Sequence, residues 1–93
     1  MKYRIEYSNT FKRSYKRAQK RGLPMNELNN VVRTLAEGRM LAAKYRDHAL
    51  TGQSKSCREC HIQPDWLLFY RIQERLEILD LINTGTHADI FKM

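Results

Sequence analysis

A polar junction between two apolar segments limits the possible folds of this chain more than any other stretch. The junction, residues 61–66, reads His-Ile-Gln-Pro-Asp-Trp. Pro64 has no backbone N–H and keeps the residue before it out of the helical region, which predicts a turn or a strand edge here. A carboxylate beside an indole at an exposed turn is unusual for a folding signal alone. Asp65 and Trp66 therefore mark a place where an ionisable group and a flat ring are held side by side.

The segments around this junction have the patterns of β-strands. Residues 56–63 alternate between two faces, and residues 66–73 are apolar on both faces, which is typical of a central strand. A turn at residues 74–75 leads to a third, apolar-rich strand at residues 76–82. The Thr-Gly-Thr-His sequence that follows is expected to end this strand, and residues 88–91 are expected to form a short closing turn or helix.

The first part of the chain predicts one strand and two helices. Residues 2–7 alternate as a half-buried strand does, and three good helix N-caps follow. An apolar stripe at helical spacing then predicts a helix to about Arg21, with Gly22 as its C-cap. A second helical stripe begins near Pro24 and ends at Gly38. The short connection between these segments predicts an antiparallel helix pair.

The predicted order of elements defines the fold class. Residues 39–55 show no clear period and are expected to form a loop. The remaining pattern is a strand, a two-helix hairpin and a three-strand antiparallel meander, the order βααβββ. This order predicts an α+β domain in which a curved, mostly antiparallel sheet packs on the helix pair. A chain of 93 residues fits one such domain, residues 1–93.

Positive charge is concentrated in the first half of the chain. The net charge is +7, and residues 1–46 carry twelve Lys and Arg against three Asp and Glu. A basic half of this kind favours a polyanion or an acidic protein as a partner. Six of the cations lie on the outer face of the first predicted helix, either as a solvated surface or, in the interpretation we favour, as an anion-facing one. These are Lys12, Arg13, Lys16, Arg17, Lys20 and Arg21.

Residues 57–61, Cys-Arg-Glu-Cys-His, match the attachment pattern of c-type haem. In a strand, however, Cys57 shares a face with Glu59 and His61, whereas Cys60 points to the opposite face. This alternation argues against haem thioethers, against an easy disulfide and against both thiols binding one zinc ion. We therefore interpret the two cysteines as ordinary strand thiols and expect no cofactor and no metal ion.

The sequence also bears on the compartment. The longest unbroken apolar run, residues 66–70, is far too short to cross a membrane. The first residues contain no apolar segment of the kind that signal peptides have. We therefore expect a cytoplasmic protein without membrane association.

Three blocks of this sequence resemble a known family. Residues 45–52 read Tyr-Arg-Asp-His-Ala-Leu-Thr-Gly, residues 60–68 read Cys-His-Ile-Gln-Pro-Asp-Trp-Leu-Leu, and residues 84–91 read Thr-Gly-Thr-His-Ala-Asp-Ile-Phe. Their order and spacing closely resemble those of the YafQ toxins, which belong to the RelE/ParE superfamily of bacterial type II toxin–antitoxin systems.

The resemblance implies a fold, an activity and partners. It implies a RelE-like domain that cuts mRNA in the ribosomal A site as an endoribonuclease. It also implies neutralisation by a cognate antitoxin, expected to be small and acidic, and binding to operator DNA only as the toxin–antitoxin complex. Matched by motif, the family's catalytic positions fall on His48, His61, Asp65 and His87, and positions tied to activity through substrate contact fall on Trp66 and Phe91.

One position departs from the family pattern. Close relatives often have an arginine just before the Thr-Gly-Thr-His block, where this chain has Asn83. A neutral amide cannot replace a permanent cation at a phosphate. Either another cation, such as Arg58 or Arg46, contacts that phosphate, or the rate or the substrate preference differs. Lys44 is a further candidate for substrate binding.

The candidate residues suit metal-independent RNA cleavage, in which the 2′-hydroxyl attacks the adjacent phosphorus. Such an enzyme removes the 2′-OH proton, protonates the departing 5′-oxygen and stabilises the phosphorane, and histidine suits proton transfer near neutral pH. We expect His87 to be the general acid and either Asp65 or His61 the general base. His48 either holds phosphate or shares proton transfer. Asp65 alternatively orients a neighbouring imidazole and keeps it protonated.

The aromatic side chains have two interpretations. Trp66 and Phe91 can stack on RNA bases, each worth about 1–3 kcal/mol, but a lone tryptophan is by default a core residue. His61, inside a strand, can likewise be an interior histidine.

Two other functions fit the same fold. One is a non-catalytic module that binds RNA or protein, and it predicts salt-sensitive binding without growth arrest. The other is a gyrase-directed toxin of the ParE branch, against which the histidines argue because poisoning gyrase needs no proton transfer.

Overall fold

The computed structural model of the chain describes residues 1–50 and 56–91, and the side chain of Phe91 lies outside the described part. Thr51 and Gly52, the end of the first family-like block, also lie outside it. The elements in chain order are β1 (Arg4–Tyr7), α1 (Asn9–Lys20), α2 (Met25–Ala36), η1 (Ala43–Tyr45), β2 (His48–Ala49), β3 (Arg58–Gln63), β4 (Trp66–Gln73), β5 (Ile78–Gly85) and α3 (His87–Phe91).

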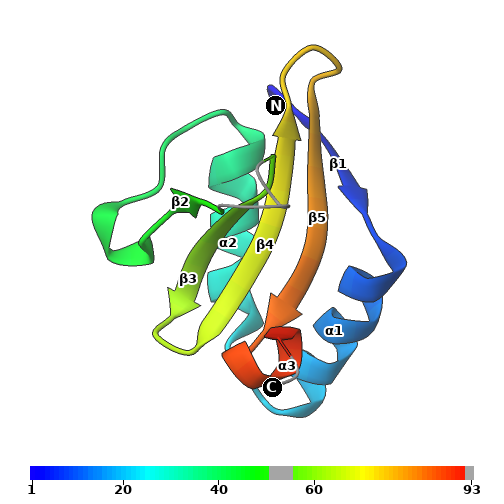
Figure 1. The fold of residues 1–93 in the computed structure, drawn as a ribbon, viewed down its shortest axis with the longest axis vertical. Coiled ribbons are helices and arrows are strands. Elements are labelled where there is room, and N and C mark those ends of the chain that lie inside the picture. Colours follow the sequence, from blue (N-terminus) through cyan, green and yellow to red (C-terminus); the bar gives the residue numbers. More distant parts are fainter. Residues whose placement is uncertain (51–55, 92–93) are drawn as a thin grey trace.

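The strands form one twisted sheet in the order β1-β5-β4-β3-β2 (Figure 1). The predicted antiparallel meander is confirmed, since β4 pairs antiparallel with both β3 and β5. The N-terminal strand β1 pairs in parallel with β5, with Arg4 opposite Ile78. The first and last strands of the chain are therefore neighbours, and β2 forms the opposite edge.

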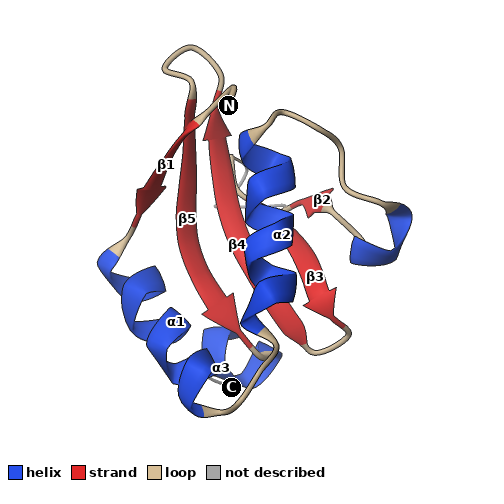
Figure 2. Ribbon diagram, turned by 180° about the vertical axis from the view of Figure 1, so that it is seen from behind, coloured by secondary structure: helices blue, strands red, loops and turns tan. Residues whose placement is uncertain are grey.

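The two long helices cover one face of the sheet (Figure 2). The hydroxyl of Ser8 accepts a hydrogen bond from the Phe11 N–H and caps α1. Beyond the two helices, Gly22 and Gly38 adopt φ angles of 77° and 78°, in the left-handed region that glycine enters without strain. Both predicted helices are confirmed. No helix in the described ranges is long and apolar enough to cross a membrane.

The core lies between this helical layer and the sheet. The fully buried side chains include Leu28 and Val31 from α2 and Leu68, Tyr70 and Leu79 from the strands. Burying a Leu or Val side chain contributes roughly 1.5–3 kcal/mol before entropic costs are counted. Because the helices occupy one face only, the opposite face of β3, β4 and β5 is left for other side chains.

The predicted loop at residues 39–55 contains two short elements. A turn of 3₁₀ helix, η1, is followed by its C-cap residue Arg46, whose φ of 48° lies in the left-handed region. The two-residue strand β2 then pairs with β3, with His48 opposite Glu59. Elements of two or three residues have no periodicity, so a sequence pattern could not reveal them.

The third strand of the meander is longer than predicted. The Thr-Gly-Thr-His block was expected to break it, but β5 continues through Thr84 to Gly85. Thr84 is buried, and its hydroxyl donates to the Leu67 carbonyl at 2.6 Å, which keeps this end of β5 on β4. The chain then enters the short helix α3 at His87.

Candidate active site

The structure brings the three histidines together in a row. His48 lies on β2, His61 on β3 and His87 at the start of α3. The ring centroids of His48 and His61 are 6.5 Å apart, and those of His61 and His87 are 6.0 Å apart. The prediction that the fold gathers these side chains is confirmed, while their chemical roles remain predictions.

The alternation of β3 explains this arrangement. Cys60 and Ile62 are buried in the core cluster beneath the sheet. Glu59 and His61, one residue out of phase, therefore project from the other face. His48 stands opposite Glu59 in the β2–β3 register, and this pairing carries it to the same place. Burial of the Cys60 side chain also raises the pKa of its thiol to about 12, as fits an unreactive core cysteine.

Asp65 and His87 form a pair at the end of the row. Asp65 lies in the turn between β3 and β4, and its Oδ1 is 2.9 Å from His87 Nδ1. The same oxygen accepts the backbone N–H of His87 at 3.3 Å. These two bonds from His87 lower the pKa of the Asp65 carboxyl. Asp65 is therefore ionised at neutral pH and orients the imidazole.

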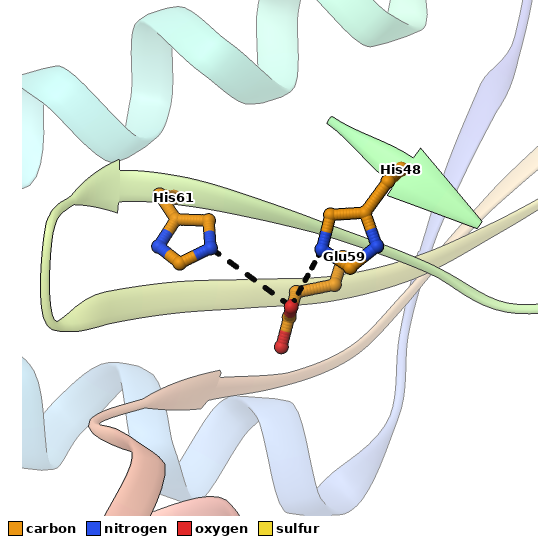
Figure 3. A group of neighbouring side chains, drawn as sticks. All are labelled: His48, Glu59 and His61. Carbon is orange, nitrogen blue, oxygen red and sulfur yellow. Dashed lines mark ion pairs between the residues drawn. The ribbon is translucent and has the colours of Figure 1, made fainter. Parts of the chain in front are cut away.

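Glu59 is a site residue that the sequence prediction omitted. Its Oε2 lies 2.9 Å from His48 Nε2 and 3.9 Å from His61 Nε2 (Figure 3). The residue is only 7% exposed, so a carboxylate sits beneath the two imidazoles. Strand alternation already placed Glu59 on the face of His61, and that was the available signal. The pairing with His48 depends on β2, which was not predicted.

Two of the predicted substrate-contacting cations flank the row. Lys44 and Arg46 line a pocket of about 360 Å³ together with His61 and Pro64. Both cationic residues are exposed. Their placement keeps them as candidate phosphate contacts beside the histidines.

Arg58 occupies a different position. Its Nε donates to Asp47 Oδ1 at 3.2 Å and to the Tyr70 hydroxyl at 3.3 Å. The Tyr70 hydroxyl donates to the same Asp47 oxygen at 2.5 Å. This cluster fixes the residue before His48, and strand alternation puts Arg58 on the face opposite His61. The placement does not support Arg58 as a phosphate contact and gives it a positioning role instead.

The position of Trp66 does not fit its predicted stacking on RNA bases. The residue is 2% exposed, and its indole N–H donates to Thr84 Oγ1 at 3.0 Å. A ring enclosed in the core cannot stack on a base, so the predicted stacking role is wrong for this conformation. The core interpretation holds, and the Trp66–Thr84 bond secures the end of β5 that leads to His87.

The remaining two predicted positions have less structural support. Phe91 ends α3, but its side chain lies outside the described residues. Asn83 stands opposite Phe69, which in turn stands opposite Glu59, so it belongs to the same cross-strand row. Its Oδ1 accepts the Thr84 N–H at 2.9 Å.

Fold and site together define a class of protein: a small α+β domain whose sheet presents histidines and carboxylates suited to proton transfer beside cationic loop residues. A family model described as "Bacterial toxin of type II toxin-antitoxin system, YafQ" matches residues 3–92. The chain belongs to this family, and the resemblance found in its sequence is confirmed.

Individual relatives agree with this assignment. The mRNA interferase toxin YafQ of Escherichia coli strain K12 is 41% identical over 88 residues, 94% of either chain. YafQ in the E. coli DinJ–YafQ complex is 39% identical, with a TM-score of 0.89 over 96% of this chain and 98% of that one. A metal-bound toxin from Helicobacter pylori is 41% identical, with a TM-score of 0.90 over 98% of this chain and 100% of that one. The predicted fold class is therefore confirmed.

Proposed function

We propose that this chain is a metal-independent endoribonuclease that cleaves mRNA as the toxin of a type II toxin–antitoxin system. The observation that carries the proposal is the row of three imidazoles at about 6 Å spacing, with the Asp65–His87 pair at its end. The name of the E. coli relative, an mRNA interferase toxin, supports the same activity.

The proposed reaction is transesterification within the RNA. The 2′-oxygen forms a bond to phosphorus, the bond from phosphorus to the 5′-oxygen breaks, and the products are a 2′,3′-cyclic phosphate and a 5′-hydroxyl. One proton leaves the 2′-hydroxyl and one reaches the 5′-oxygen, so the step needs a base and an acid but no oxidant or metal ion. A positioned acid or base typically contributes about 10²–10⁴ in rate.

His87 is the proposed general acid. The ionised carboxylate of Asp65 accepts a hydrogen bond from Nδ1 of His87, and this bond orients the ring and stabilises the protonated imidazole. Since this contact occupies the Asp65 carboxylate, we assign the general base to His61 rather than to Asp65. His61 Nδ1 lies 3.1 Å from the Pro64 carbonyl, which holds the hydrogen on Nδ1 and leaves Nε2 to accept a proton.

His48 and the loop cations are proposed to bind the reacting strand. The His48 side chain is half exposed at one end of the row, where it can contact a phosphate oxygen. Lys44 and Arg46 flank the pocket beside His61 and supply permanent positive charge. Single-stranded RNA in the ribosomal A site is the proposed substrate, and the basic first half of the chain favours approach to such a polyanion.

An apolar groove offers a place for a protein partner. It has a volume of about 480 Å³ and is lined by apolar side chains from β1, both helices and β5, with Lys12 and Lys16 among the lining residues. Tyr7, which lines it, is 51% exposed. We propose that an acidic, amphipathic segment of the cognate antitoxin binds here, because its apolar side would fill the groove and its carboxylates would meet the lysines. The apolar lining residues are Tyr7, Phe11, Tyr15, Val32 and Leu81.

The remaining proposals concern context. The E. coli relative has been crystallised with DinJ. We propose that this chain likewise assembles with a cognate antitoxin, that it contacts operator DNA only in that complex, and that it acts in the cytoplasm.

The test uses ribosomes programmed with a defined A-site codon, with cleavage mapped by primer extension. The wild-type chain should cut the message, and His87→Ala should reduce the rate at least about 100-fold, because it removes the acid. Arg75→Ala, an exposed change in the β4–β5 turn, is the matched control and should cut normally. Intact message with the wild type, or equal cutting by His87→Ala, would refute the proposal.

A further inference from the structure

Three side chains of the site converge on one point. One ring nitrogen of His48, one of His61 and an oxygen of Glu59 all lie within 4.8 Å of one another. They come from two paired strands, β2 and β3 (Figure 3). The backbone of a sheet therefore fixes their mutual spacing.

Both imidazoles are oriented by backbone carbonyls. His48 Nδ1 lies 3.3 Å from the Ala49 carbonyl oxygen, and His61 Nδ1 lies 3.1 Å from that of Pro64. A carbonyl only accepts, so each ring directs the N–H of Nδ1 to it, and Nε2 is the nitrogen that faces Glu59. A metal ion can there replace the hydrogen that otherwise lies between His48 Nε2 and the carboxylate. Metal-binding histidines are held in this way, with one ring nitrogen donating to a carbonyl and the other facing the metal ion.

The carboxylate is enclosed. Glu59 is 7% exposed, and both Nε2 atoms face its Oε2. A carboxylate withdrawn from water is costly unless a positive charge balances it. Three electron-pair donors aimed at one point form an arrangement that a cation stabilises.

We propose that His48, Glu59 and His61 bind one divalent transition-metal ion of the Zn²⁺ class. Two imidazole nitrogens and one carboxylate oxygen favour Zn²⁺ over Mg²⁺ and Ca²⁺, which take oxygen ligands. In a tetrahedral site with bonds of about 2.0–2.1 Å, ligand atoms lie about 3.3 Å apart. The distances of 2.9 and 3.9 Å from the Glu59 oxygen to the two Nε2 atoms bracket that value, so small side-chain rotations complete the site.

The bound ion inhibits RNA cleavage, a consequence that rests on the proposed function. A metal ion on Nε2 of His61 takes the lone pair that accepts the 2′-OH proton. The same ion holds His48 away from phosphate. His87 is left outside the ligand set, although its ring centroid is 6.0 Å from that of His61.

The binding test needs no catalysis. Chelator-treated protein is titrated with zinc chloride in a calorimeter, and the ¹⁵N resonances of the histidine rings are followed by NMR. One Zn²⁺ should bind per chain, the Nε2 resonances of His48 and His61 should shift more than those of His87, and Mg²⁺ should produce neither effect. Glu59→Gln, which keeps the shape of the side chain, should weaken Zn²⁺ binding at least about tenfold because it removes the charged ligand.

Cys57→Ser is the matched control, because its partly exposed thiol, directly before β3, is the alternative zinc ligand. It should bind Zn²⁺ as the wild type does. Undiminished binding by both Glu59→Gln and His48→Ala, each shown to be folded by circular dichroism, would overturn the proposal. So would a loss of binding in Cys57→Ser.

An activity measurement separates the two proposals. Zn²⁺ at a concentration that saturates the site should reduce ribosome-dependent cleavage at least tenfold, and chelator should restore it. Cleavage that continues at full rate with the site saturated would overturn the inhibitory role. A protein that binds Zn²⁺ as described but never cuts message would instead refute the proposed nuclease and leave the metal site standing.

Discussion

At the scale of single residues, the carboxylates of Asp65 and Glu59 differ in burial, and this difference suits them to different roles. Asp65 is exposed and pairs with one imidazole, whereas Glu59 is enclosed and faces two. An exposed carboxylate can orient a proton donor that meets substrate. A buried one is better suited to holding positive charge in place.

The first prediction concerns Asp65. Asp65→Asn keeps the shape of the side chain but removes the charge that stabilises a protonated His87. Because Asp65 orients the acid without transferring the proton itself, cleavage should slow by about 10- to 100-fold, less than the effect of removing the imidazole. Single-turnover cleavage on programmed ribosomes measures this, and a wild-type rate would exclude a positioning role for Asp65.

The second prediction concerns Trp66. Trp66→Phe removes the buried N–H that binds Thr84 and leaves a small void, so it should lower the free energy of unfolding by about 1–3 kcal/mol. Urea denaturation measures this change. Cleavage per folded molecule at saturating ribosomes should stay within about threefold of the wild type. A large loss of kcat/KM with unchanged stability would restore the stacking role that the burial of the ring contradicts.

At the scale of elements, an ion pair joins the first helix to the last. Arg21 follows α1, and its guanidinium donates to Asp89 of α3 at 2.6 and 3.2 Å. Asp89 also accepts the Thr86 N–H at 3.0 Å. The cationic helix α1 contains no acidic residue, and Asp89 of α3 supplies one next to it. This contact helps to fix α3, the helix that carries His87.

The third prediction follows from this pair. The Arg21 guanidinium, followed by the Thr86 N–H, holds the pKa of the Asp89 carboxyl well below its usual range. A depressed native pKa stabilises the fold above the unfolded value of about 4, and the contribution is lost as the pH falls below it. Asp89→Asn should therefore lower the melting temperature at pH 7, and the difference from the wild type should shrink towards pH 2. Calorimetric scans at both pH values decide this, and a constant difference would contradict it.

The fourth prediction concerns the groove between the long helices. Lys16→Glu reverses one charge on its lining and should weaken antitoxin binding about tenfold or more, because an acidic partner would then be repelled. Lys20→Glu makes the same change one turn further along α1, away from the groove lining, and is the matched control. Surface plasmon resonance with the purified antitoxin compares the two variants. Equal losses would show that overall charge, rather than the groove, determines binding.

At the scale of the whole molecule, local patterns predicted the elements, but only the structure shows how they meet. The order βααβββ and both helices were accessible from local sequence patterns, whereas the gathering of His48, His61 and His87 was expected only from the family resemblance. The parallel pairing of β1 with β5 was not, because no local pattern reports contacts between the two ends of a chain. Glu59 was missed for a related reason: its partner His48 is placed by a strand too short to leave a periodicity.

The two halves of the chain also contribute different parts of the molecule. The first half supplies most of the positive charge and the helices, and the second half supplies most of the ionisable groups on the sheet. Trp66 and Thr84 connect the two halves. The indole N–H of Trp66 donates to the Thr84 hydroxyl, and the backbone N–H of Thr84 donates to the Ser14 hydroxyl of α1 at 3.3 Å. The core network therefore supports the site without belonging to it.

The two-residue strand β2 gives the molecule a weak edge. It attaches His48 to the rest of the sheet through a short ladder with β3 and through the contact of the neighbouring Asp47 with Tyr70 and Arg58. Such a segment can detach by sub-global opening at a free energy well below that of complete unfolding. We expect the amide of Leu50, which follows β2 and donates to the Cys57 carbonyl at 3.0 Å, to exchange with deuterium faster than that of Leu68 in the central strand. On heating, RNA cleavage should be lost at a temperature at which the near-ultraviolet circular dichroism spectrum is still that of the native protein.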